Sequence, residues 1–194
     1  MRLQRYLLLA ATLLAFGVIA LGAYVRLSDA GLGCPDWPGC YGHLLGVPDQ
    51  AHEQLAASQA FPGRPVETGK AWKEMVHRYF AGTLGLLILA IFINAWRREV
   101  RDRQSPLLPS LLLVIVTLQA ALGMWTVTLL LKPMIVTLHL LGGMTTLALL
   151  LTLLLRGGRT AATPRTGNRL RLLAALALLL VIAQIALGGW VSSN

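Results

Sequence analysis

Two histidines stand inside long apolar stretches of the sequence. His77 lies five residues after Trp72, and His139 lies six residues after Pro133. At a rise of 1.5 Å per helical residue, these offsets are about 7.5 Å and about 9 Å, so both imidazoles are expected at nearly one depth. Ionisable groups inside membrane spans are costly and usually functional, although a single histidine can also be a hydrogen-bonded packing residue.

Small residues follow both histidines at helical spacing. They leave room for a flat macrocycle against the helix backbone, or alternatively for close contact between two helices. Because histidine is a common axial ligand of heme iron, the pattern predicts a heme site with His77 and His139 as its iron ligands. The small residues are Ala81, Gly82 and Gly85 after the first histidine, and Gly142 and Gly143 after the second.

Charged residues accompany this end of the predicted site. Glu74 precedes His77 by three residues and so shares its helix face. It is predicted to accept a proton or to lie beside a bound substrate; the alternative is an interfacial carboxylate at the helix start. Arg78 is predicted to bind an anionic propionate of a porphyrin, although snorkelling to the interface is the better explanation for any one cation alone. Other cations near this end are Arg26, Lys73 and Lys132.

The sequence contains two cysteines, Cys34 and Cys40, in one loop that is rich in proline and glycine. If the loop faces an oxidising compartment, a disulfide is expected, and it would be a structural clasp or a redox-active pair. A metal site is disfavoured, because two thiolates have no evident further ligands nearby.

The elements that must position these residues are membrane helices. Of 194 residues, 56% are hydrophobic and 13% are charged, well below the roughly 25% charge of a soluble domain. The apolar residues form runs close to the length that crosses a bilayer, and in lipid such runs must be helical. The predicted spans are Tyr6–Val25, Met75–Trp96, Leu107–Leu131, Met134–Leu155 and Leu172–Val191.

The distribution of charge predicts the orientation. The net charge of +9 does not indicate nucleic acid, because eleven of the 17 basic residues fall on one side of an alternating topology. The positive-inside rule makes that side cytoplasmic. The N-terminus is then inside and the segment 26–71 outside, in a bacterial inner membrane. The eleven are Arg2, Arg5, Arg97, Arg98, Arg101, Arg103, Arg156, Arg159, Arg165, Arg169 and Arg171.

An internal repeat organises the chain. Ile19–Val25 reads Ile-Ala-Leu-Gly-Ala-Tyr-Val, and Ile185–Val191 reads Ile-Ala-Leu-Gly-Gly-Trp-Val. Because the first motif recurs, and because the first apolar run is longer than that of a signal peptide, the first span is expected to be retained. We expect residues 1–156 to form a four-helix transmembrane unit, 157–171 a basic cytoplasmic loop, and 172–194 the first helix of an incomplete second unit.

These motifs together resemble the heme A synthase family. The similar stretches are Gly22–Cys40, which ends in Gly-Leu-Gly-Cys-Pro-Asp-Trp-Pro-Gly-Cys; Trp72–Gly82; Gln119–Pro133; Val136–Gly143; and Ile185–Asn194. The resemblance implies eight helices in two similar halves and an enzyme that oxidises a methyl group of heme O to a formyl group, giving heme A.

The same resemblance implies roles for the residues. His77 and His139 would flank the iron of heme O, Glu74 would lie close to the reaction, and Cys34 with Cys40 would match the family's loop cysteines. A heme b would belong to the other half, so this chain alone is expected to be inactive. Implied partners are the lipid bilayer, heme O, a heme O-producing enzyme and assembly factors of terminal oxidases, with no nucleic acid.

Two other classes of function share some of these residues. A membrane b-type cytochrome that carries electrons would need the histidine pair but neither Glu74 nor the thiols. A quinone-linked thiol oxidoreductase would use Cys34 and Cys40 and would need no intramembrane histidines.

Overall fold

The protein is an all-α membrane protein. The computed structural model describes residues 2–101, 104–156 and 167–193, and within these ranges it contains no β-strand. Five helices are long and apolar enough to cross a membrane, which confirms the predicted spans. The helices are α1 (Arg2–Leu27), α2 (Ala51–Ala60), α3 (Thr68–Ala95), α4 (Arg98–Arg101), α5 (Leu107–Thr128), α6 (Pro133–Arg156) and α7 (Asn168–Ser193).

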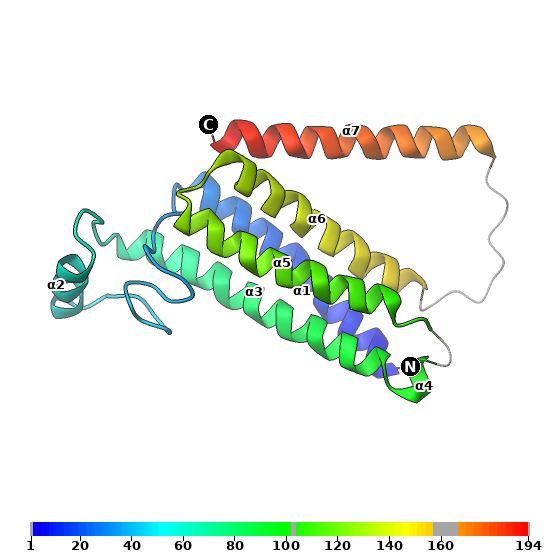
Figure 1. Cartoon of the computed structure of the whole chain (residues 1–194), viewed down its shortest axis with the longest axis horizontal. Helices are drawn as coiled ribbons and strands as arrows, with labels where there is room; N and C mark the ends of the chain where they lie inside the picture. Colours follow the sequence, from blue (N-terminus) through cyan, green and yellow to red (C-terminus); the bar gives the residue numbers. More distant parts are fainter. Residues whose placement is uncertain (1, 102–103, 157–166, 194) are drawn as a thin grey trace.

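Four of the long helices form a bundle in which each packs on two neighbours. Helix α1 packs on α3, α3 on α5, α5 on α6, and α6 on α1. Helices α3 and α6 therefore stand at diagonally opposite corners. The segment 28–67 extends from one end of the bundle, which we call the loop end, while the N-terminus and α4 lie at the other (Figure 1).

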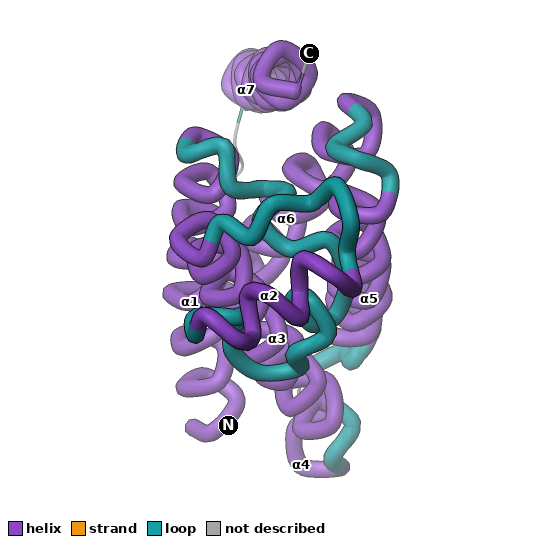
Figure 2. Tube along the Cα trace, turned by 90° about the vertical axis from the view of Figure 1, so that its left-hand side faces the viewer, coloured by secondary structure: helices purple, strands orange, loops and turns teal. Residues whose placement is uncertain are grey.

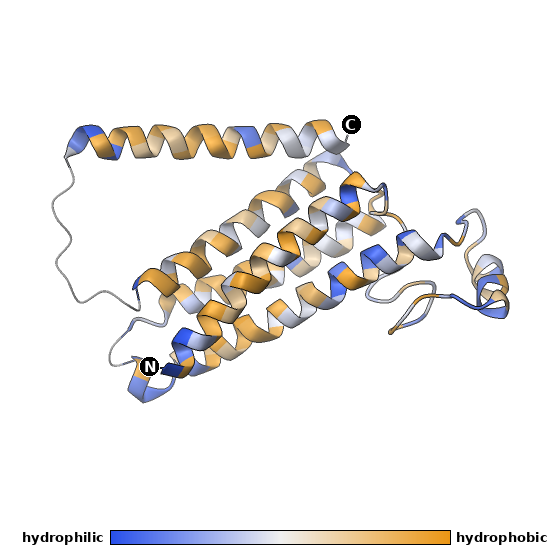
Figure 3. Cartoon of the chain, turned by 180° about the vertical axis from the view of Figure 1, so that it is seen from behind, coloured by the Kyte–Doolittle hydropathy of each residue, from blue (hydrophilic) through white to orange (hydrophobic). Residues whose placement is uncertain are grey.

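Apolar residues at helical spacing fill the half of the bundle away from the loop end. Leu8, Ala11 and Ala15 of α1 meet Leu84 and Ile88 of α3, and all are buried. Many large apolar residues of the bundle are exposed, and the spanning helices carry the hydrophobic colour over much of their length (Figure 3). A surface of this kind suits lipid rather than water.

A buried polar pair lies near the N-terminal end of this core. The Asn94 side chain donates a 2.7 Å hydrogen bond to the Gln4 side chain. Because a polar group must be paired in lipid, this bond holds α1 and α3 in one register.

The helix ends differ from the predicted spans where the chain leaves the apolar layer. Helix α3 begins at Thr68 rather than Met75, so its first two turns are polar and the connecting segment is shorter than expected. Arg169 and Arg171, predicted in a loop, lie in the first turn of α7. Arg103, Arg159, Arg165, Asn194 and most of the predicted loop 157–171 lie outside the described residues.

The 28–67 segment folds over the loop end (Figure 2). It contains the short helix α2. The Glu53 carboxylate accepts a 3.1 Å hydrogen bond from the Gln50 backbone N–H, which caps α2. The same backbone bond lowers the pKa of Glu53. The segment has its own small core around the two cysteines, which includes Tyr41, Val47 and Met75.

The carboxyl-terminal part of α7 packs on α6, and the amino-terminal part of α7 diverges from α6 (Figure 1). Gly189 is its buried residue, and it lies against Thr137 and Leu140 of α6. Arg26 of α1 donates a hydrogen bond to the carbonyl oxygen of Ser192. Arg26 and Ser192 occupy equivalent places, because each follows one copy of the repeated motif directly.

Candidate functional site

The two intramembrane histidines come from opposite corners of the bundle. His77 is on α3 and His139 is on α6, and the rings are close enough for an electrostatic interaction between them. Each ring lies against a glycine of a neighbouring helix. A Cβ atom added at Gly22 of α1 would be 3.0 Å from Cε1 of His77, and one added at Gly123 of α5 would be 3.4 Å from Cε1 of His139.

Each of the two imidazole rings has one buried nitrogen without a hydrogen-bond partner within the described part of the chain. In both rings that nitrogen is Nδ1. The His77 ring lies near the backbone of Val18 on α1, and the His139 ring lies near the backbone of Gln119 on α5. Histidines that bind metals usually pair one nitrogen with a carbonyl or carboxylate and leave the other free for the metal.

This donor set fits an iron porphyrin better than a bare metal ion. The described residues contain no cluster of three or more His, Cys, Asp or Glu that could hold a metal ion. A porphyrin supplies four equatorial nitrogens itself, so the protein needs to supply only axial ligands. The unpartnered nitrogens of His77 and His139 would be available as two such ligands.

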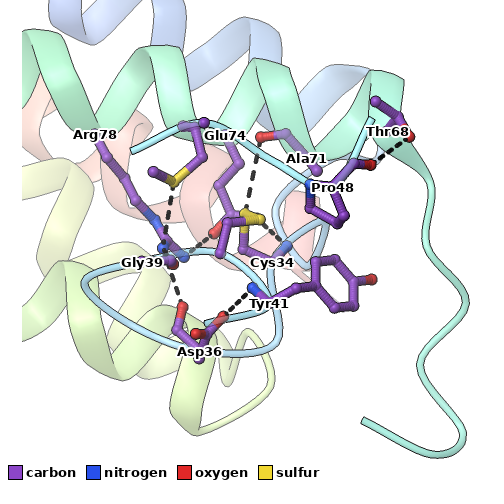
Figure 4. The surroundings of a disulfide bond; sticks show 12 residues. Cys34, Asp36, Gly39, Tyr41, Pro48, Thr68, Ala71, Glu74 and Arg78 are labelled. Atoms are coloured by element: carbon purple, nitrogen blue, oxygen red, sulfur yellow. Dashed lines mark hydrogen bonds and ion pairs between the residues drawn. A yellow bond between two sulfur atoms is a disulfide. The ribbon is translucent and has the colours of Figure 1, made fainter. Parts of the chain in front are cut away.

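Glu74 is buried beneath the disulfide loop, with 4% of its surface exposed. Its Oε2 accepts a 2.9 Å hydrogen bond from the Cys34 backbone N–H, and its Oε1 lies 2.5 Å from Nη2 of Arg78 (Figure 4). The carboxylate therefore joins α3 to the loop, one turn nearer the loop end than His77. The sequence predicts that Glu74 shares a helix face with His77, but it does not predict the contacts of Glu74 with Cys34 and Arg78.

Arg78 uses its guanidinium to hold the same loop. Its Nη1 donates to the backbone carbonyls of Asp36 at 3.0 Å and Pro38 at 3.3 Å, and also to that of Gly39. Its Nη2 is paired with Glu74. The predicted binding of a porphyrin propionate stays a prediction, and the observed contacts give Arg78 a role in fixing the loop.

Cys34 and Cys40 form the predicted disulfide, with an S–S distance of 2.05 Å. Both residues are fully buried. Thiol–disulfide exchange requires access to a sulfur atom, so burial favours the structural clasp over the redox-active pair.

The turn inside the disulfide loop is fixed by side chains. The Asp36 carboxylate accepts hydrogen bonds from the backbone N–H groups of Tyr41 at 2.6 Å and Gly42 at 2.8 Å. The Tyr41 hydroxyl donates a 2.8 Å hydrogen bond to the carbonyl oxygen of Pro65. Burial raises the pKa of Tyr41, so its hydroxyl keeps the proton that it donates.

The glycines that contact the imidazoles are not the small residues that follow the histidines in the sequence. Gly82 and Gly85 have nothing within 4 Å of an added Cβ atom, and the Gln119 side chain occupies the space beside Gly142. The glycines that touch the imidazoles, Gly22 and Gly123, come from neighbouring helices. In the sequence, the repeated motif singles out Gly22, because the second copy of the motif has a glycine, Gly188, at the same place.

Comparisons with known proteins identify the family of the chain. Residues 5–194 match the family model described as "Cytochrome oxidase assembly protein". A heme A synthase of Shewanella oneidensis is 50% identical over 179 residues, covering 91% of this chain and 53% of the relative. No solved structure matches the chain.

More distant relatives carry the same name. A heme A synthase of Bacillus licheniformis is 30% identical over 123 residues, covering 63% of this chain and 34% of the relative. One of Novosphingobium aromaticivorans is 28% identical over 215 residues, covering 98% of this chain and 59% of the relative. The chain spans about half the length of the curated relatives it matches. The extent of the family match and the identity to these relatives show that the chain belongs to the heme A synthase family.

Proposed function

We propose that the chain is the part of a heme A synthase that binds the substrate heme O, through His77 and His139. The observation that carries this proposal is the pair of buried imidazoles on diagonal helices, each with an unpartnered ring nitrogen. The relatives are named heme A synthases, so the proposed reaction is one that forms heme A. By the resemblance in the sequence, a methyl group of heme O is oxidised to a formyl group.

Each residue would have its own role in binding or reaction. His77 and His139 would hold the iron, and the nearby backbone of Val18 and Gln119 would help to orient the rings. Glu74 is the proposed catalytic residue at the ring edge. Each of its oxygens already accepts one hydrogen bond, and a carboxylate oxygen can accept a second, so the carboxylate can still take a proton from a bound group. The porphyrin iron supplies the redox chemistry when it is bound.

The wider arrangement belongs to the same proposal. Residues 1–156 form the substrate unit, and 172–194 contribute the first helix of a second unit, whose heme b would pass electrons onward. Because the relatives are about twice as long, we propose that this chain alone does not complete the oxidation. The membrane is the bacterial inner membrane, with the N-terminus in the cytoplasm, and the partners are a heme O-producing enzyme and terminal oxidase assembly factors.

The proposal is tested by identifying the pigment that the 194-residue chain retains. The chain is purified in detergent from a host that makes heme O, and the pigment is extracted and identified by mass spectrometry. Heme O supports the proposal. Heme B alone supports a b-type cytochrome, and absence of any heme contradicts both. Glu74→Gln is expected to retain heme O, because the amide keeps the shape of the carboxylate and lies outside the pair of iron ligands.

A further inference from the structure

Two adjacent leucines of the 28–67 segment are exposed although neither is on a membrane-spanning helix. Leu44 is 73% exposed and Leu45 is 81% exposed. Trp37, which is 41% exposed, precedes the same turn. Single exposed apolar residues are ordinary, but a contiguous apolar group marks a surface that something covers.

The leucines are displayed on a fixed frame. Before them, Cys40 and His43 exchange two backbone hydrogen bonds, of 2.9 Å and 3.0 Å. After them, the Gly46 backbone N–H donates a 2.7 Å hydrogen bond to the Tyr79 hydroxyl on α3. Because the chain is held on both sides, Leu44 and Leu45 project from the loop instead of folding onto the core of the segment.

The contact with Tyr79 places this loop at the level of the membrane surface. Trp96 and Arg97 end α3 at the side away from the loop end. Tyr79 lies 17 residues before Trp96, about 26 Å along the helix axis at 1.5 Å per residue. A hydrocarbon layer is about 30 Å thick, so Tyr79 and Gly46 lie close to the opposite boundary of that layer.

We propose that Leu44 and Leu45 insert into the boundary between lipid headgroups and acyl chains beside α3. Phe80, the next residue of α3 after Tyr79, is 45% exposed, so α3 also has exposed apolar surface at this level. The insertion would hold the disulfide loop, and with it the contacts to Glu74 and Arg78, at a set height above the bilayer.

Site-directed spin labelling tests this insertion. Both cysteines of the chain are in the disulfide, so Leu45→Cys adds the sole reactive thiol for a nitroxide label. The labelled full chain is placed in phosphatidylcholine–phosphatidylglycerol nanodiscs. Collision rates are measured with oxygen, which concentrates in lipid, and with a nickel chelate, which stays in water. Leu55→Cys on α2 is the matched control, since Leu55 is also exposed, at 62%.

We expect an oxygen-to-nickel collision ratio several-fold higher at position 45 than at position 55. Equal ratios at the two positions would place Leu45 in water and overturn the proposal. Low collision rates with both reagents would indicate contact with protein, such as a second copy, and would also overturn it. Leu44→Cys repeats the measurement on the neighbouring residue if the first variant does not retain its disulfide.

Discussion

At the scale of single residues, the histidine pair depends on glycines that belong to other helices. Each imidazole lies across the gap between two helices, against a glycine of its neighbour. Polarity and spacing in the sequence suffice to find His77 and His139, because a histidine in an apolar run stands out. They do not identify Gly22 or Gly123, since contact between helices depends on how the bundle closes.

The contact at Gly22 gives a direct prediction. Gly22→Val should displace the His77 ring and weaken heme binding by roughly tenfold or more, because the added Cβ would lie 3.0 Å from the ring and an overpacked site costs about 1–3 kcal/mol. Gly17→Val, on the same helix, is the control, since nothing lies within 4 Å of a Cβ atom there. Heme titration followed by absorbance measures both, and equal affinities for the two variants would rule out the contact.

Glu74 and Arg78 form a buried ion pair, which gives a second prediction at this scale. Arg78→Gln should destabilise the loop by about 3 kcal/mol, because it leaves an unpaired buried carboxylate. The double variant Glu74→Gln, Arg78→Gln should be less damaging than Arg78→Gln alone, since no charge is then stranded. Rates of proteolysis within residues 28–67 report the difference. If the double variant is cleaved faster than Arg78→Gln, the pairing does not hold the loop.

At the scale of elements, the apolar runs predict the five spanning helices and locate their centres well. The ends are harder to predict, because the first turns of α3 are polar and are stabilised by contacts with the 28–67 segment. Cys34 and Glu74 are 40 residues apart in the sequence. Nothing local in the sequence signals this contact, so the burial of Glu74 under the disulfide loop could not be predicted.

The orientation of these elements is a prediction that experiment can decide. Basic residues cluster at the end opposite the 28–67 segment, so that end should be cytoplasmic. A reporter that is active only outside the cytoplasm should therefore be active when fused after Asp49 and inactive when fused after Arg101. The reverse pattern would invert the topology.

At the scale of the whole molecule, the bundle has an apolar half and a half that contains the histidines and Glu74. Buried residues such as Leu84, Ile88 and Leu150 fill the first half, while the histidines, Glu74 and the disulfide loop gather toward the loop end. This separation lets the packed half fix the helices, while the other half brings ionisable groups from α3 and α6 together. Residues 168–193 form α7, which the repeat in the sequence predicts to belong to a second unit.

The central claim is that His77 and His139 bind one iron from two sides. The most direct measurement is the absorption and resonance Raman spectrum of the heme-loaded chain, compared with His77→Ala and His139→Ala. We predict a six-coordinate, low-spin spectrum for the unmodified chain. Each variant should lose that spectrum or lose the heme, because each removes one axial ligand. A six-coordinate low-spin spectrum and unchanged affinity in either variant would contradict the claim.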